Sequence, residues 1–179
     1  METGCEPPRI VAGMPMYNEE ETIGTVVTMA LRHVDEVICI DDGSSDSSAR
    51  IAEACGATVI RHRGNQGYGA ALKTLFKTTR NSDTDVLVVL DSDGQHDTTD
   101  IPKLIQPILD EEADFTIGSR FVEGGEGNDM PAYRRLGIKV ITAASNLTSD
   151  LDIKDTQSGF RAFSRKAIDR LRFDADGME

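Results

Sequence analysis

Short apolar segments alternate with stretches of helical periodicity along the first 118 residues of the chain. In the stretches between these segments, apolar residues recur three or four positions apart, which predicts amphipathic helices. Alternating strands and helices of this length predict an α/β fold, in which a mostly parallel central sheet is covered by helices on both faces. Strands are expected at Arg9–Ala12, Glu36–Ile40, Thr58–Arg61, Val86–Leu90 and Phe115–Gly118.

The clearest helix is expected over Ile101–Leu109. Asp100 is its expected N-cap, and Pro102 lies in its first turn, where a proline is tolerated. Pro107 is expected to kink the helix because it removes a backbone hydrogen bond.

The pattern changes after Gly118. A polar, glycine-rich loop is expected over Glu123–Asp129, and a further helix is expected from about Tyr133 to Leu147. No linker divides the chain, and 179 residues suit one hydrophobic core. A single domain over residues 1–179 is therefore predicted.

Polar or glycine-rich sequence follows each of the first four predicted strands. Ligands of open parallel sheets bind beyond the carboxyl ends of the strands, and these segments meet there. Four such segments at one edge of one sheet predict a ligand site at that edge. The segments are Pro15–Glu20, Asp41–Ser45, Gly64–Gly69 and Asp91–Gln95.

The segment after the fourth strand gives the clearest indication of a ligand site, because it contains Asp91, Ser92 and Asp93. Two carboxylates two residues apart can hold a hard divalent cation, and Gln95 offers a neutral oxygen nearby. Such a cation would stabilise a diphosphate as a leaving group. The same residues can equally form a solvated turn before a helix. His96, beside them, is a candidate ligand or base in the first interpretation and an ordinary polar residue in the second.

Asp41 and Asp42, after the second strand, also permit two interpretations. They can form a turn before the next helix, or a carboxylate there can accept hydrogen bonds from a base or a ribose. The loop Gly64–Gly69 matches neither the dinucleotide-binding fingerprint nor the P-loop, so its glycines predict a tight turn beside the site. The other two histidines are interpreted as surface residues: His33 and His62.

The charge of the chain is distributed unevenly. Residues 1–114 carry 9 Lys and Arg against 21 Asp and Glu, which accounts for the whole net charge of −12, whereas residues 115–179 carry ten of each. An acidic chain binds nucleic acid poorly, so no nucleic-acid partner is expected. An anionic ligand would need a bridging cation in the acidic part and arginines in the later part. Alternatively, the surplus carboxylates only keep the surface soluble.

A reducing cytoplasm is the expected location. The three cysteines are odd in number and lack metal-binding spacing. The N-terminus lacks the apolar core of a signal peptide, and no apolar run approaches the ~18 residues that would span a bilayer.

Taken in order, these motifs resemble the family 2 inverting glycosyltransferases of the GT-A fold. The resemblance is closest to the branch of the dolichol-phosphate mannose and dolichyl-phosphate glucose synthases, and it spans Arg9 to Leu171. It implies a Rossmann-like three-layer sandwich, with a nucleotide-sugar-binding half at residues 8–118 and an acceptor-side half at residues 119–179. The motifs are Pro15–Glu20, Asp41–Ser44, Gly64–Gly69, Asp91–His96, Gly118–Arg120 and Ser158–Arg161.

The resemblance also implies roles for individual residues. The nucleotide-sugar site would comprise Pro15, Tyr17, Glu19, Ile40, Asp42, Asp91, Ser92, Asp93 and Arg120. The ligands of a Mg²⁺ or Mn²⁺ ion would be Asp91, Asp93 and Gln95, and the catalytic residues would be Asp93 and Arg120. The acceptor's phosphate would be bound by Arg134 and Arg135.

The implied reaction is the metal-dependent transfer of a hexose, with inversion, from a GDP-mannose or UDP-glucose type of donor to a polyprenyl (dolichyl) phosphate. A phosphate acceptor is already anionic at neutral pH, so it needs little help from a general base. An acceptor hydroxyl would need a base, and Asp155 is the candidate. The family continues past Ser158–Arg161, so we expect acceptor-side segments beyond residue 179. The full-length protein is expected at the cytoplasmic face of the membrane.

Three alternatives stay open. The chain can be a soluble family 2 enzyme that acts on a sugar hydroxyl in polysaccharide synthesis, a nucleotidyltransferase, or a nucleotide-sugar-binding module without turnover. A nucleotidyltransferase is disfavoured because the first strand is not followed by a glycine-rich loop that carries Arg or Lys. None of these patterns predicts the oligomeric state.

Overall fold

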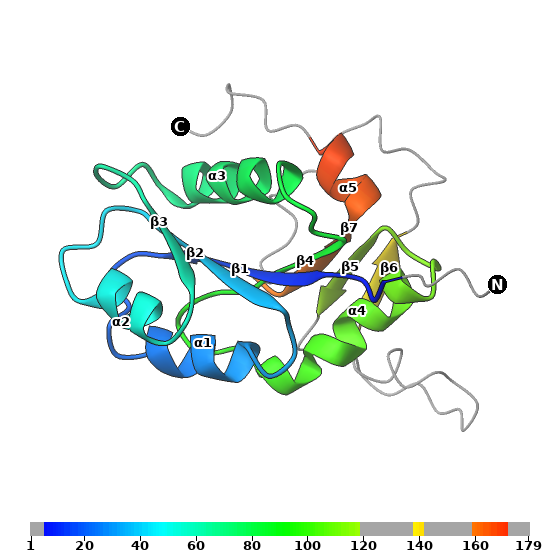
Figure 1. Cartoon of the computed structure of the whole chain (residues 1–179), viewed down its shortest axis with the longest axis horizontal. Coiled ribbons are helices and arrows are strands. Elements are labelled where there is room, and N and C mark those ends of the chain that lie inside the picture. Colours follow the sequence, from blue (N-terminus) through cyan, green and yellow to red (C-terminus); the bar gives the residue numbers. More distant parts are fainter. Residues whose placement is uncertain (1–5, 119–137, 142–158, 172–179) are drawn as a thin grey trace.

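The computed structural model of the chain describes residues 6–118, 138–141 and 159–171. These residues form a sheet with the strand order β3-β2-β1-β4-β7-β5-β6 (Figure 1). Strands β1 to β4 pair in parallel, whereas β7 runs antiparallel to both β4 and β5, and β6 runs antiparallel to β5. The strands are β1 Ile10–Met16, β2 Glu36–Asp41, β3 Thr58–Arg61, β4 Val86–Val89, β5 Phe115–Gly118, β6 Ile138–Ile141 and β7 Arg161–Ser164.

Helices cover both faces of this sheet and complete three layers (Figure 1). Helices α1 (Ile23–Ala30), α2 (Ser48–Ala54) and α4 (Ile101–Leu109) pack on one face, and α3 (Tyr68–Arg80) and α5 (Arg165–Arg170) pack on the other. A short 3₁₀ helix, η1 (Thr98–Asp100), leads into α4. Because successive side chains of a strand point to opposite faces, each strand feeds two hydrophobic cores. In β4, Val86 and Val88 join the first core, and Leu87 and Val89 join the second. The predicted three-layer α/β fold is confirmed.

All five predicted strands are present, within a few residues of their expected ends. The largest difference is at β1, which continues to Met16 and so includes Pro15. Helix α4 has the predicted bounds, but the expected N-cap contributes no side-chain hydrogen bond. Instead, Asp97 caps the preceding 3₁₀ helix by accepting from the Thr99 amide at 2.9 Å.

The helix expected over residues 133–147 is wrong at its centre. Residues 138–141 form β6, which pairs with β5 from Phe115↔Ile141 to Gly118↔Ile138. Three of these four residues are β-branched, which favours a strand once a partner strand is present. The remainder of that expected helix, and the loop expected over residues 123–129, lie outside the described residues.

Strand β7 is the last strand among the described residues, yet it lies between β4 and β5 in the sheet. It pairs with β4 from Val86↔Ser164 to Val89↔Arg161. Because the two strands are antiparallel, the residues that precede β7 lie beside the exit of β4. Gly159 and Phe160 are thereby brought next to the acidic segment that follows β4.

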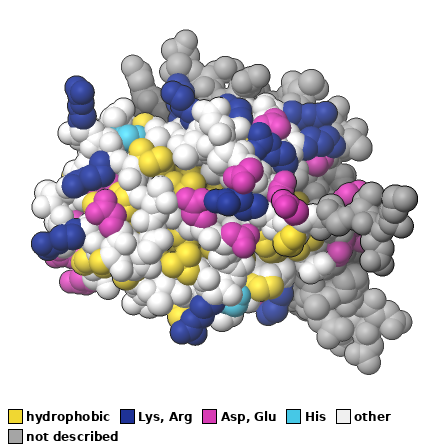
Figure 2. Space-filling model, viewed as in Figure 1, with side chains coloured by type: hydrophobic (Ala, Val, Ile, Leu, Met, Phe, Trp, Pro, Cys, Tyr) yellow, Lys and Arg dark blue, Asp and Glu magenta, His cyan; other side chains and the backbone are white. Residues whose placement is uncertain are grey.

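Acidic and basic side chains are interspersed on the face of the molecule seen in Figure 2. The surplus of carboxylates therefore does not form a patch of one sign on that face. Within the described ranges, no helix is long and apolar enough to cross a bilayer.

Candidate functional site

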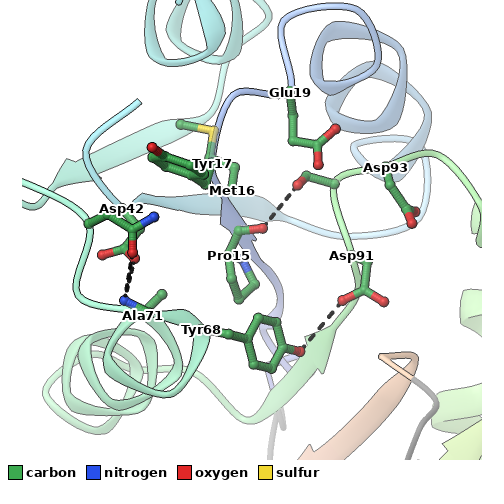
Figure 3. A pocket seen from close by; sticks show the side chains of 12 residues that line it. Pro15, Met16, Tyr17, Glu19, Asp42, Tyr68, Ala71, Asp91 and Asp93 are labelled. Atoms are coloured by element: carbon green, nitrogen blue, oxygen red, sulfur yellow. Dashed lines mark hydrogen bonds between the residues drawn. The ribbon is translucent and has the colours of Figure 1, made fainter. Parts of the chain in front are cut away.

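A cavity of about 280 Å³ lies at the edge of the sheet where the parallel strands end (Figure 3). Residues from the ends of β1 and β2, the start of α3 and the exit of β4 surround it. The predicted ligand loops therefore do meet. The lining residues are Pro15, Met16, Tyr17, Glu19, Asp42, Asn65, Gly67, Tyr68, Ala71, Asp91, Ser92 and Asp93.

The two carboxylates after β4 both line this cavity. Asp91 is contacted on both oxygens: Tyr68 Oη lies 3.5 Å from Oδ1, and His96 Nε2 lies 3.1 Å from Oδ2. In Asp93, Oδ1 accepts the Gln95 amide at 2.9 Å. The described residues contain no cluster of three or more His, Cys, Asp or Glu side chains that would bind a metal ion by themselves.

The donor set nevertheless fits Mg²⁺ or Mn²⁺ bound together with a diphosphate. Mg²⁺ is commonly held by one or two carboxylates while phosphate oxygens and waters complete its coordination. Asp91 and Asp93 provide two hard oxygen ligands on one wall of an open cavity. The Gln95 side chain is exposed and does not line the cavity, so its predicted role as a ligand has less support than theirs.

The hydroxyl of Ser92 fixes the segment that carries these carboxylates. It is buried and donates to the Pro15 carbonyl at 3.0 Å (Figure 3). The Ser92 carbonyl in turn accepts from Thr22 Oγ1 at 2.8 Å. The exit of β4 is thus tied to the end of β1 and to the N-terminus of α1.

Asp42 lines the opposite wall and is almost wholly buried. Its carboxylate accepts from the amides of Gln66 at 3.0 Å and Gly67 at 2.7 Å, and Oδ1 lies 2.6 Å from His62 Nδ1. Burial by itself raises the pKa of Asp42, but the hydrogen bonds from His62, Gln66 and Gly67 outweigh burial and lower it. Asp42 is therefore held as a carboxylate, and it anchors the loop before α3 as well as facing the cavity.

His62 does not lie on the surface as predicted, since only 9% of its side chain is exposed. Its ring bridges Asp42 and Thr74, with Nε2 lying 2.8 Å from Thr74 Oγ1 on α3. Sequence reasoning failed here because nothing near His62 in the chain indicates that its partner is a carboxylate twenty residues earlier.

Two tyrosines flank the cavity with partly exposed rings. Tyr17 and Tyr68 are each 46% exposed, which is unusual for side chains of this size. Partial desolvation and the neighbouring charge of Asp91 raise the pKa of Tyr68 to about 12, so this hydroxyl remains a donor at neutral pH. No role was predicted for Tyr68, although its place between Gly67 and Gly69 in the third polar segment could have indicated one.

The other predicted site residues are placed as follows. Ile40 is fully buried in the core under α3 and does not line the cavity. Pro15, Tyr17, Glu19, Asp42, Asp91, Ser92 and Asp93 all line it. Arg120, Arg134, Arg135 and Asp155 lie outside the described residues.

A three-layer α/β fold with a carboxylate-lined cavity at the ends of its parallel strands defines the class of α/β proteins that bind their ligands at the carboxyl edge of the sheet. Within that class, the family model described as glycosyl transferase family 2 matches residues 12–172. The chain therefore belongs to glycosyl transferase family 2, as the resemblance implied.

Archaeal relatives are about one third identical to this chain over the aligned region. The UDP-N-acetylglucosamine–dolichyl-phosphate N-acetylglucosaminyltransferase of Methanococcus voltae is 32% identical over 173 residues, covering 87% of this chain and 69% of its own length. The dolichol-phosphate mannosyltransferase of Pyrococcus furiosus is 32% identical over 176 residues, covering 93% of this chain and 49% of its own length. The chain thus spans about half to two thirds of the length of these relatives.

Solved structures of the same fold come from Mycobacterium tuberculosis. Its glucosyl-3-phosphoglycerate synthase with Mg²⁺ and UDP is 28% identical, with a TM-score of 0.60, and covers 89% of this chain and 57% of its own. Another structure of that synthase contains Mn²⁺, UDP-glucose and phosphoglyceric acid, with a TM-score of 0.59. These neighbours support the GT-A type of fold.

Proposed function

We propose that this protein transfers a hexose, with inversion, from a nucleoside diphosphate sugar to a polyprenyl phosphate, using Mg²⁺ or Mn²⁺. The observation that carries the proposal is the meeting of Asp91 and Asp93 with Tyr17 and Asp42 around one cavity. Carboxylates on one wall and an aromatic ring with a hydrogen-bonded aspartate on the other match the two ends of a nucleoside diphosphate. The names of the archaeal relatives support a polyprenyl phosphate as acceptor.

The nucleoside is proposed to bind between the ends of β1 and β2. The partly exposed ring of Tyr17 offers a surface on which a base can stack. Asp42 borders the cavity on this wall, and its two oxygens accept from His62, Gln66 and Gly67, with the Gln66 amide shared between both oxygens. Pro15 and Glu19 complete this wall.

The diphosphate is proposed to lie along Asp91, Ser92 and Asp93. A divalent cation, when bound there, supplies positive charge that stabilises the diphosphate as it leaves. Asp91 and Asp93 would hold that cation, and the Ser92 bonds to β1 and α1 keep both carboxylates on the same wall. Arg120, from outside the described residues, is proposed to contact a phosphate and to act with Asp93 in catalysis.

A phosphate acceptor would make a general base unnecessary in this reaction. The acceptor oxygen is already negatively charged at neutral pH, so proton removal is not required before it attacks the anomeric carbon. Arg134 and Arg135 are proposed to bind this phosphate, because a guanidinium can hold two of its oxygens at once. An enzyme with such an acceptor would work at the membrane surface.

A pair of variants at the two ends of β4 tests the proposal. In Asp93→Ala, binding of UDP or GDP in the presence of Mn²⁺ should be lost, and formation of sugar-linked polyprenyl phosphate should fall with it. The matched control is Asp83→Ala, which removes a carboxylate before β4 that is 79% exposed and far from the cavity. Isothermal titration with UDP and GDP, with and without Mn²⁺, measures the first effect and identifies the base.

Unchanged diphosphate affinity in Asp93→Ala would reject the metal site. Turnover is measured by incubating each nucleotide sugar with dolichyl phosphate and extracting the lipid product. Tight metal-dependent nucleotide binding with no lipid product from any donor would favour another acceptor.

A second acceptor class has one specific observation in its favour. The solved neighbours include complexes of UDP-glucose with phosphoglyceric acid, which is a small acceptor and not a lipid. In such a reaction the hydroxyl acceptor needs a base, and Asp155 is the candidate. Transfer to a soluble hydroxyl compound, lost in Asp155→Asn while nucleotide affinity is kept, would establish this alternative.

A further inference from the structure

The carboxylate of Asp91 is contacted from behind by residues that have no place in the function proposed above. His96 Nε2 lies 3.1 Å from Asp91 Oδ2, and only 9% of the His96 side chain is exposed. A carboxylate can only accept a hydrogen bond, so Nε2 must carry the proton that is donated. This fixes the tautomer of the ring or leaves it doubly protonated, and it directs one carboxylate oxygen away from Tyr68.

The backbone of Gly159 approaches the same carboxylate. A Cβ atom added at Gly159 would overlap Oδ2, Cγ and Oδ1 of Asp91. The backbone conformation of Gly159 is not one that requires glycine, since its φ lies outside the left-handed region. The small side chain is therefore needed for closeness to Asp91 and not for a turn.

Phe160 and Arg161, which follow Gly159, also interact with the surroundings of Asp91. The ring of Phe160 stacks on that of His96, with centroids 5.4 Å apart and planes inclined by 20°. Arg161 is buried, and burial lowers the pKa of its guanidinium, while the interactions with Tyr68 and Asp91 oppose that lowering. Arginine stays protonated in proteins, so a positive charge lies close to Asp91.

We propose that His96, Gly159 and Phe160 are positioning residues for Asp91, together forming a support that fixes its carboxylate for cation binding. The inference rests on the proposed function in one respect, the cation at Asp91. The support restrains Oδ2 through His96 and Gly159 and presents Oδ1, on the side of Tyr68, to a ligand in the cavity. Partners that orient a metal-ligating side chain contribute strongly to metal affinity even though they never touch the metal.

The direction of β7 explains how Gly159 reaches Asp91. Antiparallel pairing with β4 ends at Val89↔Arg161, so the chain before β7 must pass directly behind the exit of β4. A parallel strand in that position would present its opposite end to this edge. Gly159, Phe160 and Arg161 thus lie near Asp91 because β7 runs antiparallel to β4.

Substitution of His96 tests the support through metal affinity. His96→Leu should weaken Mn²⁺ binding in the presence of UDP or GDP by about 10-fold or more. His96→Gln should weaken it less, because its amide nitrogen can replace Nε2 as a donor. The matched control is His33→Leu, a half-buried histidine outside the cavity wall, which should leave Mn²⁺ affinity unchanged. Electron paramagnetic resonance of free Mn²⁺ measures all four proteins without turnover.

Equal Mn²⁺ affinities in the wild type and His96→Leu would overturn the proposal for His96. Equal losses in His96→Leu and His96→Gln would mean that the ring packs against Phe160 without orienting Asp91, which also overturns it.

Substitution of Gly159 tests the support without any metal. Gly159→Ala should lower the melting temperature of the wild type by several degrees, because the added methyl group displaces the Asp91 carboxylate. In an Asp91→Ala background the overlapping atoms are gone, so the same substitution should change the melting temperature little. Equal destabilisation in both backgrounds would show that Gly159 is needed for some reason other than Asp91.

The two measurements separate failure of the inference from failure of the proposed function. If the wild type binds no Mn²⁺ with either nucleotide, the proposed metal-dependent function fails, and the melting-temperature cycle alone decides whether Gly159 supports Asp91. If Mn²⁺ binds but neither variant behaves as expected, the function stands and the support is rejected.

Discussion

The carboxylate of Asp42 anchors the loop before α3. Three donors converge on it, namely the ring of His62 and the amides of Gln66 and Gly67. An aspartate that receives this many hydrogen bonds has little freedom to rotate toward a ligand. Its effect on nucleotide binding therefore includes the placement of Asn65 and Gly67, which line the cavity beside it.

Substituting Asp42 should weaken nucleoside binding. Asp42→Ala is expected to reduce the affinity for uridine or guanosine by ~1–3 kcal/mol, the usual cost of leaving a buried hydrogen-bonding group unpaired. Thr79→Val is a suitable control, because it removes a buried hydroxyl from the far end of α3. Titration calorimetry with the nucleosides measures the effect, and unchanged affinity for both would make Asp42 a purely structural residue.

The stability that Asp42 contributes should depend on pH. Its pKa is lower in the folded protein than its ordinary value near 4, so the folded state favours the ionised form. This contribution is complete above the ordinary value and is lost as the pH falls through the lowered value. The free energy of unfolding of the wild type should thus exceed that of Asp42→Asn at pH 7, and the gap should narrow below about pH 4. Urea unfolding of both proteins from pH 7 downward measures the gap, and a constant gap would contradict the assignment.

At the scale of secondary-structure elements, two arginines join α3 to α5. Arg165 donates to the carbonyl of Arg80, the last residue of α3, at 2.9 Å and to that of Ser82, just past the helix, at 2.6 Å. In return, Arg80 donates to the Ile168 carbonyl at 3.0 Å in α5. Carbonyls at the ends of helices lack partners within the helix, so this exchange satisfies groups that would otherwise depend on water. It also anchors the strand β7 that α5 follows.

Removing one of these arginines should destabilise the protein without touching the cavity. Arg165→Ala is expected to cost about 1–3 kcal/mol of unfolding free energy, because charge-assisted bonds to three carbonyls, those of Arg80, Ser82 and Thr84, are lost. Arg165→Lys should recover only part of this, since an ammonium group cannot reproduce the guanidinium fork. Arg50→Ala is the control: Arg50 is exposed on α2 and bonds only the Ser47 hydroxyl in the described residues, so its loss should cost less than about 0.5 kcal/mol.

Chemical denaturation of these three variants measures the costs. Nucleotide affinity, measured alongside, should stay at the wild-type value in Arg165→Ala. If Arg50→Ala and Arg165→Ala lowered the free energy of unfolding equally, the bonds between α3 and α5 would make no specific contribution to stability.

At the scale of the whole molecule, the uneven charge of the chain accords with two anionic ligands. The cavity is built almost entirely from the acidic first part, where two carboxylates face the expected diphosphate and a cation must mediate. The later part carries as many basic as acidic residues, including Arg134 and Arg135. Direct binding of a phosphate by guanidinium groups is possible there without a metal.

This division predicts different kinetic effects for the two parts of the chain. In enzyme that turns over both substrates, Arg134→Ala or Arg135→Ala should raise the KM for polyprenyl phosphate and leave donor affinity nearly unchanged. The control is Arg170→Ala, which removes an exposed arginine from α5. Steady-state kinetics with both substrates varied decide the matter. Equal loss of donor affinity, or no change in acceptor KM in either variant, would move the assignment to a hydroxyl acceptor with Asp155 as base.

The sequence by itself determined the local elements and the edge at which the site lies. Apolar periodicity is a property of neighbouring residues, so β2, β3, β5 and α4 could be placed closely from it. Parallel strands joined by helices bring all their carboxyl ends to one edge, so the meeting of Tyr17, Asp42, Asp91 and Asp93 followed from connectivity. Family membership followed from the order of the same motifs.

Only the tertiary structure decided what depends on partners far along the chain. Residues 138–141 became a strand because β5 offers an unpaired edge, which outweighs a helical pattern read from neighbours alone. His62 is buried against Asp42, and Gly159 lies against Asp91, because strand order and strand direction bring them together. A sequence records which residues can make such contacts. Which contacts are made depends on the packing of the whole sheet, because each such pairing forms only when distant segments close around a shared core.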